Sequence, residues 1–230
     1  MARADIDSAT RAYLDRLRQD LIFTETLRGE TLRFHTTWGL FSPKGLDEGS
    51  RLLIDHLEIR PEDDTLDLGC GYGPLGLIMA RLAPAGTSVL VDKDFVAVEY
   101  SKRNARLNGI DNVEILLSNG FDAIRERRFD VIVANLPAKV GRAGLDEFLF
   151  GAGPLLRSGG TLAFVHVTPL TSQIDGLRAD FERSGGKLEV VLESSGKEHR
   201  ALHWRFPEGL PQRKPASSPR SSAHAFSGIG

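Results

Sequence analysis

The most constraining feature of the sequence is a regular alternation of apolar runs and amphipathic segments between residues 64 and 206. The apolar runs read TLDLG, TSVLVD, VEILL, FDVIVAN, GTLAFVHV and KLEVVLES, and most of the segments between them have helical spacing. Strands that alternate with helices form right-handed βαβ crossovers, which place the strands side by side in parallel. The sequence therefore predicts an α/β fold with a mostly parallel sheet.

The last two apolar runs, KLEVVLESS and HRALHWRF, are separated only by the residues GKE. A crossover between parallel strands needs a dozen or more residues, whereas a hairpin needs only a few. We therefore expect the last pair of strands to be antiparallel.

Two histidines in this last run, His199 and His203, have the i, i+4 spacing of a metal pair on a helix. The alternation of Leu202 and Trp204 with polar residues instead predicts a strand, with both histidines and Arg205 on its polar face. Since the sequence offers no third ligand, it predicts no metal site.

Outside the alternating region, the sequence divides into an N-terminal extension and a tail. Apolar spacing predicts a helix from Ser8 to Leu27, capped by Asp7 or Ser8, then a short strand at Leu32 to Thr36 and a helix at LDEGSRLLIDHL. The final residues are rich in Pro, Ser and Gly, which is typical of disorder. The expected division is a helical extension over 1–30, one domain over 31–206 and a disordered tail over 207–230.

Composition limits the classes of protein to which the chain can belong. The net charge of −2 and the pI near 6.3 disfavour a protein that coats nucleic acid through bulk charge. No apolar stretch approaches the ~20 residues of a membrane span, and the N-terminus does not resemble a signal peptide. A single cysteine, Cys70, excludes an internal disulfide and favours a reducing compartment, so we expect a cytoplasmic protein that does not enter a membrane.

A glycine-rich turn follows the first strand of the predicted sheet, in the segment LDLGCGYGPLG. Asp67 lies at the end of the strand, three alternating glycines allow a tight turn, and Pro74 suits the first position of a helix. Such a turn brings backbone N–H groups close to a ligand at the carboxyl edge of the sheet. The segment therefore predicts a ligand site.

The acidic residues near this turn indicate which ligand it binds. Gly71, Gly73 and Gly76 also match the dinucleotide pattern, but Asp67 before them would repel a pyrophosphate and suit an ammonium group. Asp92, at the end of the second strand, can accept hydrogen bonds from both hydroxyls of a ribose. An amino-acid nucleoside fits better than a dinucleotide, and the predicted cofactor is S-adenosylmethionine.

Three segments resemble those of class I methyltransferases, and more narrowly the "methyltransferase small domain" family, which includes ribosomal RNA guanine-N2 methyltransferases. They are FHTTWGLFSPKGLDEGSRLL, LDLGCGYGPLGL and FDVIVANLPAKVG, and the resemblance extends over about residues 32–206. It implies a Rossmann-like fold with seven mostly parallel strands, helices on both faces and a C-terminal antiparallel hairpin.

The resemblance also implies which residues bind the cofactor. Those near its methionine part would be Asp67, Gly69, Cys70, Gly71 and Gly73. Asp92, with Lys93 beside it, would bind the ribose. The adenine would lie near Asn119, Gly120 and Phe121, after the third strand of the sheet.

The resemblance implies a tetrad of Asn-Pro-Pro followed by an aromatic or aliphatic residue, where this chain has Asn135, Leu136, Pro137 and Ala138. The Asn135 side-chain oxygen and the Leu136 carbonyl can accept the two N–H groups of an exocyclic amine, which turns its lone pair towards a methyl donor. Pro137 keeps Leu136 extended, as this role requires. We therefore interpret these three residues as catalytic.

Ala138 cannot stack on a base, so an aromatic residue from elsewhere is needed, and Phe41 is our candidate, with Trp38 as the alternative. Lys139 follows the tetrad and is a candidate for a phosphate contact.

The resulting hypothesis is an S-adenosylmethionine-dependent N-methyltransferase that acts on guanine N2 in ribosomal or other structured RNA. The acidic pI favours the alternative of a small planar amine or a protein side chain as acceptor. The altered tetrad leaves open a non-catalytic module that binds S-adenosylmethionine. A nicotinamide oxidoreductase is the least favoured reading because of Asp67.

Overall fold

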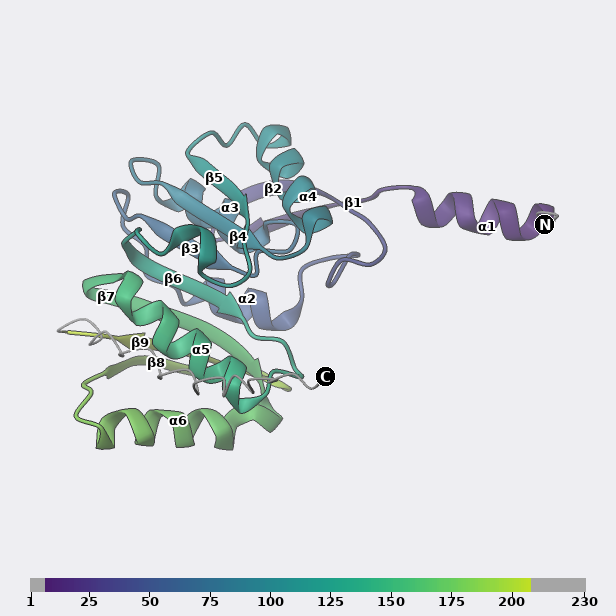
Figure 1. The fold of residues 1–230 in the computed structure, drawn as a ribbon. Helices are drawn as coiled ribbons and strands as arrows, with labels where there is room; N and C mark the ends of the chain where they lie inside the picture. The colour runs from purple at the N-terminus through teal and green to yellow at the C-terminus, as the bar shows by residue number, and fades with distance from the viewer. Residues whose placement is uncertain (1–6, 208–230) are drawn as a thin grey trace, which may run out of the picture.

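A computed structural model describes residues 7–207 of the chain, so almost all of the predicted tail lies outside the described residues. The fold is built on a seven-stranded sheet in the order β5-β4-β3-β6-β7-β9-β8, seen in Figure 1. Its strands are β3 (Thr65–Leu68), β4 (Ser88–Asp92), β5 (Val113–Leu117), β6 (Phe129–Asn135), β7 (Leu156–Val167), β8 (Glu189–Ser195) and β9 (His199–Arg205).

The pairing of these strands confirms the predicted sheet. The strands from β5 to β7 are parallel, whereas β9 runs antiparallel to both β7 and β8, with residues 196–198 as the hairpin loop. The chain moves outwards from β3 to β4 and β5, then returns to add β6 on the other side of β3. Ligands bind at such a reversal, outside the carboxyl ends of the strands.

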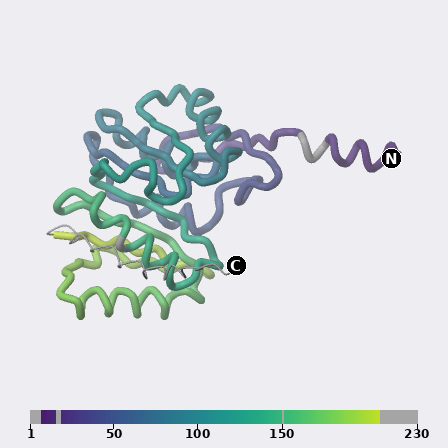
Figure 2. Tube along the Cα trace, viewed as in Figure 1, coloured from purple at the N-terminus to yellow at the C-terminus, as the bar shows by residue number. Residues whose placement is uncertain are grey.

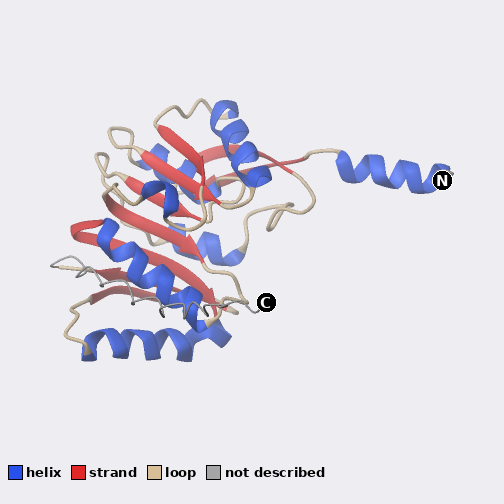
Figure 3. Cartoon of the chain, viewed as in Figure 1, coloured by secondary structure: helices blue, strands red, loops and turns tan. Residues whose placement is uncertain are grey.

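Helices cover both faces of the sheet, as Figure 3 shows. Alternate residues of one strand reach opposite faces, so Ile132 of β6 packs in one apolar cluster and Val133 in the other. The helices of the Val133 face are α2 (Glu48–Asp55), α3 (Pro74–Leu82) and α4 (Phe95–Leu107). Those of the Ile132 face are α5 (Arg142–Ala152) and α6 (Thr171–Arg183). Short 3-10 turns cover Asp122–Ile124, Gly153–Leu155 and Thr168–Leu170.

The N-terminal region differs from the prediction. The helix α1 covers only Ser8–Arg18, with Asp7 accepting a hydrogen bond from the Thr10 N–H, and the expected helix up to Leu27 is wrong in its second half. That half is the strand β1 (Leu21–Leu27), which pairs with β2 (Glu30–Thr36), the strand predicted here. Arg28 and Gly29 both have positive φ, as the two central residues of a type I′ hairpin turn do.

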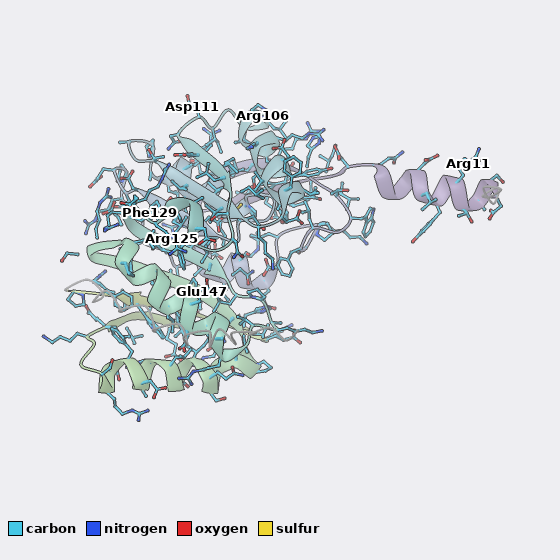
Figure 4. The ribbon with its side chains drawn as sticks, viewed as in Figure 1. Arg11, Arg106, Asp111, Arg125, Phe129 and Glu147 are labelled. Carbon is cyan, nitrogen blue, oxygen red and sulfur yellow. The ribbon has the colours of Figure 1, made fainter. Side chains whose placement is uncertain are left out.

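The helix α1 extends away from the rest of the described chain, as Figures 1 and 2 show. Arg11 marks it in Figure 4, far from the side chains that surround the sheet. Because β1 begins at Leu21 and belongs to the hairpin, we propose that the helical part of the predicted N-terminal extension, residues 1–30, ends before residue 21. Each helix within residues 7–207 is too short or too polar to span a membrane.

Two asparagines, Asn104 in α4 and Asn108 at its C-cap, attach the β1–β2 hairpin to the domain. Asn104 accepts from the His35 N–H at 2.8 Å and donates to the His35 carbonyl, and Asn108 does the same with Arg33. Each side-chain amide thereby pairs with β2 as a residue of a neighbouring strand would. Asn104 also donates to the carbonyl of Tyr72 in the glycine-rich turn, so it links the hairpin to the predicted ligand site.

Replacing Asn104 with alanine is expected to lower the free energy of unfolding by about 2–3 kcal/mol, because partly buried backbone groups of His35 and the buried carbonyl of Tyr72 lose their partner. Denaturant unfolding followed by circular dichroism measures this change. Asn108→Ala is the matched control, since Asn108 makes the same kind of contact at a more exposed position, and its effect should be smaller. Equal effects of the two substitutions would contradict the role given to Asn104.

The polar face predicted for the last strand is partly buried, since His199 and Arg205 are half-buried and His203 is buried. His203 is 2% exposed and lies on the same side of β9 as Ala201, which packs in the cluster that includes residues of α2. Burial, and then the proximity of His56, lowers the pKa of His203 to about 4. The helix α2 covers the face of β9 that carries His203, and the alternation of residues along a strand does not reveal such a helix. Within the described ranges, no group of three or more His, Cys, Asp or Glu residues could hold a metal.

Candidate active site

The carboxyl ends of the central strands surround a cavity of about 610 Å³. Its lining comes from the ends of β3, β4, β5 and β6, from the glycine-rich turn after β3 and from the start of α2. Cavities of this size are typical of sites for small molecules and cofactors. It lies at the reversal of strand order, where the fold predicts a ligand.

The glycine-rich turn forms one wall of this cavity. Gly69, Gly71 and Gly73 all have positive φ, which other residues adopt at a cost in strain. A Cβ atom built on Gly69 or Gly71 would meet no atom within 4 Å, so open space lies in front of the backbone there. Gly73 is the N-cap of α3 and does not line the cavity, so it shapes the turn rather than the surface.

Asp67 is the buried carboxylate of the site. It is 1% exposed, it lines the cavity, and its Oδ2 accepts a hydrogen bond of 2.8 Å from the Gly76 N–H. Burial, with the nearby charge of Asp92 as a further cause, raises the pKa of Asp67 to about 7. The carboxyl group is therefore poised to gain or lose a proton near neutral pH.

Cys70 also lines the cavity and is 4% exposed. Burial first, and then the charge of Asp67, raises the pKa of its thiol well above the ordinary value. The thiol therefore stays protonated and acts as a small packing group beside Ser101.

Asp92 lies at the end of β4, where its carboxylate organises the turn. Its Oδ2 accepts from the Gly71 N–H and its Oδ1 from the Asp94 N–H, both at 2.9 Å. A carboxylate has about four acceptor positions, so two remain for a ligand. Asp92 and the exposed Lys93 both line the cavity.

The residues after β5 lie differently from the predicted arrangement. Ser118 and Gly120 line the cavity, whereas Asn119 is exposed and outside the lining. Phe121 is 8% exposed and packs against Gly151 of α5 in the core, so its ring does not face the cavity. Ser118 was missed because a serine at a strand end has no distinctive signal in the sequence.

Asn135 lies at the end of β6, and both hydrogens of its side-chain amide are engaged. Its Nδ2 donates to Asp47 Oδ1 and to Ser50 Oγ, each at 3.0 Å. Its Oδ1 accepts no hydrogen bond from any described residue, and Asn135 lines the cavity. The amide oxygen is therefore the part of this group left for a ligand.

Leu136 has a structural reason to replace proline. Its N–H donates to the Val165 carbonyl at 2.9 Å, a bond that proline cannot make, and its side chain is 7% exposed in the core. Its carbonyl oxygen accepts no hydrogen bond within the described chain. Two acceptors, one from Asn135 and one from Leu136, thus lie in sequence at the end of β6.

The rest of this end of the cavity is mostly apolar. Phe41, which is 66% exposed, lines it from the segment before α2, and Pro137 and Ala138 line it from the segment after β6. Phe148 of α5 and His199 of β9 complete the wall, and neither was predicted to line it. Lys139 is exposed and lies outside the lining.

The lining fits S-adenosylmethionine better than a dinucleotide. The carboxylates of Asp67 and Asp92 suit an ammonium group and a ribose, and they oppose a pyrophosphate. A sheet of this order with such a turn and such an acidic pair defines the class of S-adenosylmethionine-dependent methyltransferases.

The chain belongs to the methyltransferase small domain family, whose model matches residues 31–196. It is an enzyme of this family, and S-adenosylmethionine is its cofactor.

Similar proteins agree with this assignment. The chain is 37% identical over 171 residues to ribosomal RNA small subunit methyltransferase C of Escherichia coli K12, which covers 70% of this chain and 49% of the relative. It is 38% identical over 142 residues to the uncharacterised protein YbxB of Bacillus subtilis, which covers 60% of this chain and 70% of the relative. The chain thus spans about half the length of the curated methyltransferases that it matches.

Among solved structures, the chain resembles the T. thermophilus 16S rRNA N2 G1207 methyltransferase in complex with AdoMet and guanosine. The TM-score is 0.67 and the identity 27%, over 81% of this chain and 50% of that chain. A methyltransferase from Pyrococcus furiosus, with a TM-score of 0.59 and 21% identity over 74% of this chain and 90% of that chain, shares the fold.

Proposed function

We propose that this enzyme methylates the exocyclic N2 amine of a guanine in ribosomal RNA. The observation that carries the proposal is the pair of acceptors at the end of β6, the Asn135 amide oxygen and the Leu136 carbonyl. The engagement of the Asn135 nitrogen by Asp47 and Ser50 supports it, because it leaves only an acceptor for the substrate. The relatives named for ribosomal RNA methylation, one of them bound to guanosine, support the choice of acceptor.

The cofactor supplies a methyl group on a sulfonium, which is already activated for transfer. We propose that Asp67 and the turn of Gly69, Cys70, Gly71 and Gly73 bind its methionine part. Asp92 and Lys93 would bind the ribose. The adenine would lie near Gly120 and Ser118, because both line the cavity whereas Phe121 does not. Asn119 is exposed outside the lining, so it would contact the adenine only with its side chain turned inwards.

The chain's contribution to catalysis is mainly alignment and the exclusion of water. The lone pair of a guanine amine is delocalised into the ring, so the amine is a poor nucleophile. Two acceptors that hold its N–H groups direct the lone pair out of the ring plane and towards the methyl donor. Pro137 keeps the Leu136 carbonyl in an extended segment. No strong base is needed, because the nitrogen becomes acidic only as it gains the methyl.

We propose that the rim of the cavity contacts RNA. Phe41 is exposed and lines the cavity, so it offers the stacking surface that Ala138 lacks. Lys139 is exposed next to the tetrad, where an ammonium group can meet a phosphate. A reducing cytoplasm, where ribosomes are made, is the compartment consistent with this substrate.

Radiolabelled methyl transfer tests the substrate class. The protein is incubated with methyl-labelled S-adenosylmethionine and, separately, with small ribosomal subunits, naked ribosomal RNA and a metabolite extract. We expect label in the RNA of the first or the second sample. Label in small molecules or in protein, with none in RNA, would refute the proposed substrate.

The raised pKa of Asp67 predicts that cofactor binding depends on pH. If the ammonium group of the cofactor binds ionised Asp67, a proton competes with it below the pKa of about 7. We expect the affinity to fall about tenfold between about pH 8 and about pH 6. The stability of the cofactor-free protein depends on pH in the opposite direction, because the folded state binds the Asp67 proton more tightly than the unfolded state does. This contribution to stability is complete below the ordinary pKa of 3.8 and is lost as the pH rises through the folded-state pKa of about 7.

Calorimetric titration of S-adenosylmethionine across this pH range measures the effect. Asp67→Asn is the matched control: an amide oxygen can still accept from the Gly76 N–H, but the group cannot ionise. Its affinity should be weaker and independent of pH over this range. A wild-type affinity that does not change with pH would exclude an ionised Asp67 as the partner of the ammonium group.

A further inference from the structure

The start of α2 contacts the end of β6, although the two segments are far apart in the sequence. Asp47 caps α2 by accepting the Ser50 N–H at 3.0 Å. The same oxygen, Oδ1, accepts from the amide of Asn135, 88 positions later, and Ser50 Oγ accepts from the same amide. The N-terminus of this helix therefore provides an acceptor for each hydrogen of the Asn135 amide.

Gly49 allows the helix to lie close enough for these contacts. A Cβ atom at this position would lie 2.9 Å from His199 Cδ2 and 3.3 Å from Val165 Cγ2, so a larger residue would push α2 away from β7 and β9. Glu48 fixes the same turn of the helix from outside, because its Oε1 accepts from the Lys197 N–H in the β8–β9 loop. The residues from Asp47 to Ser50 thus hold the start of α2 against the end of the sheet, where the cavity lies.

The chemistry of these partners determines which way the amide faces. The two ends of a primary amide have nearly the same shape, so shape alone does not distinguish its oxygen from its nitrogen. An ionised carboxylate only accepts hydrogen bonds, and it would repel an amide oxygen placed beside it. Asp47 therefore holds the nitrogen of Asn135, and the oxygen is left on the side of the cavity.

We propose that Asp47 and Ser50 are positioning residues that keep the Asn135 oxygen directed at the acceptor amine. This inference rests on the proposed function. The negative charge of Asp47 also polarises the amide, which makes its oxygen a stronger acceptor. As the amine gains the methyl it develops positive charge, which this polarised oxygen stabilises.

Asp47→Asn separates this role from helix capping. Asparagine is as good an N-cap as aspartate and has the same size, so α2 is kept. Its amide carries no charge and can present either end to Asn135. We expect the maximal rate of methyl transfer to the ribosomal substrate that the wild type labels, small subunits or naked RNA, to fall by about 10- to 100-fold. The affinity for S-adenosylmethionine should be unchanged. Ser50→Ala should act in the same direction.

Asp55→Asn is the matched control, because it removes the same charge from the exposed end of the same helix, away from the cavity. Rate and affinity should both match the wild type. If Asp47→Asn leaves the rate unchanged, or weakens cofactor binding as much as the rate, the proposal is wrong.

A double-mutant cycle tests whether Asp47 acts through Asn135. Once Asn135 is replaced with alanine, Asp47→Asn should reduce the rate by less than about twofold, since strongly coupled residues are non-additive. An equal loss in the presence and in the absence of Asn135 would overturn the proposal.

Nuclear magnetic resonance tests the same contact without any acceptor. In protein labelled with ¹⁵N at asparagine, the Asn135 side-chain signal is the one missing from Asn135→Ala. Its amide protons should exchange slowly with water in the wild type and in Asp55→Asn, and clearly faster in Asp47→Asn; equal exchange in all three refutes the positioning role. If the exchange result holds but the wild type labels no RNA, the proposed substrate fails and the positioning of the amide stands.

Discussion

Asn135→Ala is expected to reduce methyl transfer by at least about a hundredfold, because the acceptor amine loses one of the two groups that align it. The affinity for S-adenosylmethionine should stay within about twofold, since the change removes an interaction made with the acceptor. The fold should persist, because the side chain is half-buried and contacts only Asp47 and Ser50 through its amide. Single-turnover transfer of labelled methyl, with calorimetry of cofactor binding, measures both quantities.

Asn135→Asp tests whether the side chain must keep its place beside Asp47. It keeps the size of the side chain but brings a second carboxylate next to Asp47, where the amide nitrogen now lies at 3.0 Å from Asp47 Oδ1. Repulsion between the two carboxylates should displace the side chain, so this variant should also lose most of the activity. Wild-type rates in either variant would show that Asn135 does not align the acceptor.

Asp92→Ala is expected to weaken S-adenosylmethionine binding by about a hundredfold. Hydrogen bonds to a charged acceptor contribute about 1.5–3 kcal/mol each, and a ribose offers two hydroxyls, so a hundredfold loss is the lower end of the expected effect. The substitution also removes the acceptor of the Gly71 and Asp94 N–H groups, which loosens the turn that forms the cavity wall. Calorimetric titration of the cofactor measures the change.

The control is Asp111→Ala, an exposed aspartate in the loop after α4, which Figure 4 labels at the edge of the molecule. It removes the same charge outside the lining of the cavity and should leave the affinity unchanged. An Asp92→Ala protein that binds the cofactor as tightly as the wild type would remove Asp92 from the site.

The sequence predicted the sheet well because parallel strands buried on both faces are continuous apolar runs, and the three-residue loop between the last two runs permits only a hairpin. It failed at the N-terminus. The segment LIFTETL follows a helical stretch without a break in the pattern, and pairing with β2, which is a tertiary contact, decides its conformation.

The candidate site was predictable where backbone geometry demands a particular residue. Gly69 and Gly71 have positive φ and open space before them, Asp92 is the last residue of β4, and Asp67 is the last but one of β3. The partners of Asn135 were not predictable. The segment LDEGS was recognised only as a resemblance, and its physical meaning, a helix start that holds the amide of a distant residue, requires the packing of α2 against β7 and β9.

The most direct test of the central claim is the identity of the methylated nucleoside. The ribosomal substrate that accepts label, either small subunits or naked small-subunit RNA, is incubated with the protein and S-adenosylmethionine. Its RNA is digested to nucleosides, which are identified by mass spectrometry, with Asn135→Ala as the control. The account predicts N2-methylguanosine with the wild type and almost none with the variant. A methyl group on a ribose oxygen, on a carbon or on a ring nitrogen, or the same product from both proteins, would contradict it.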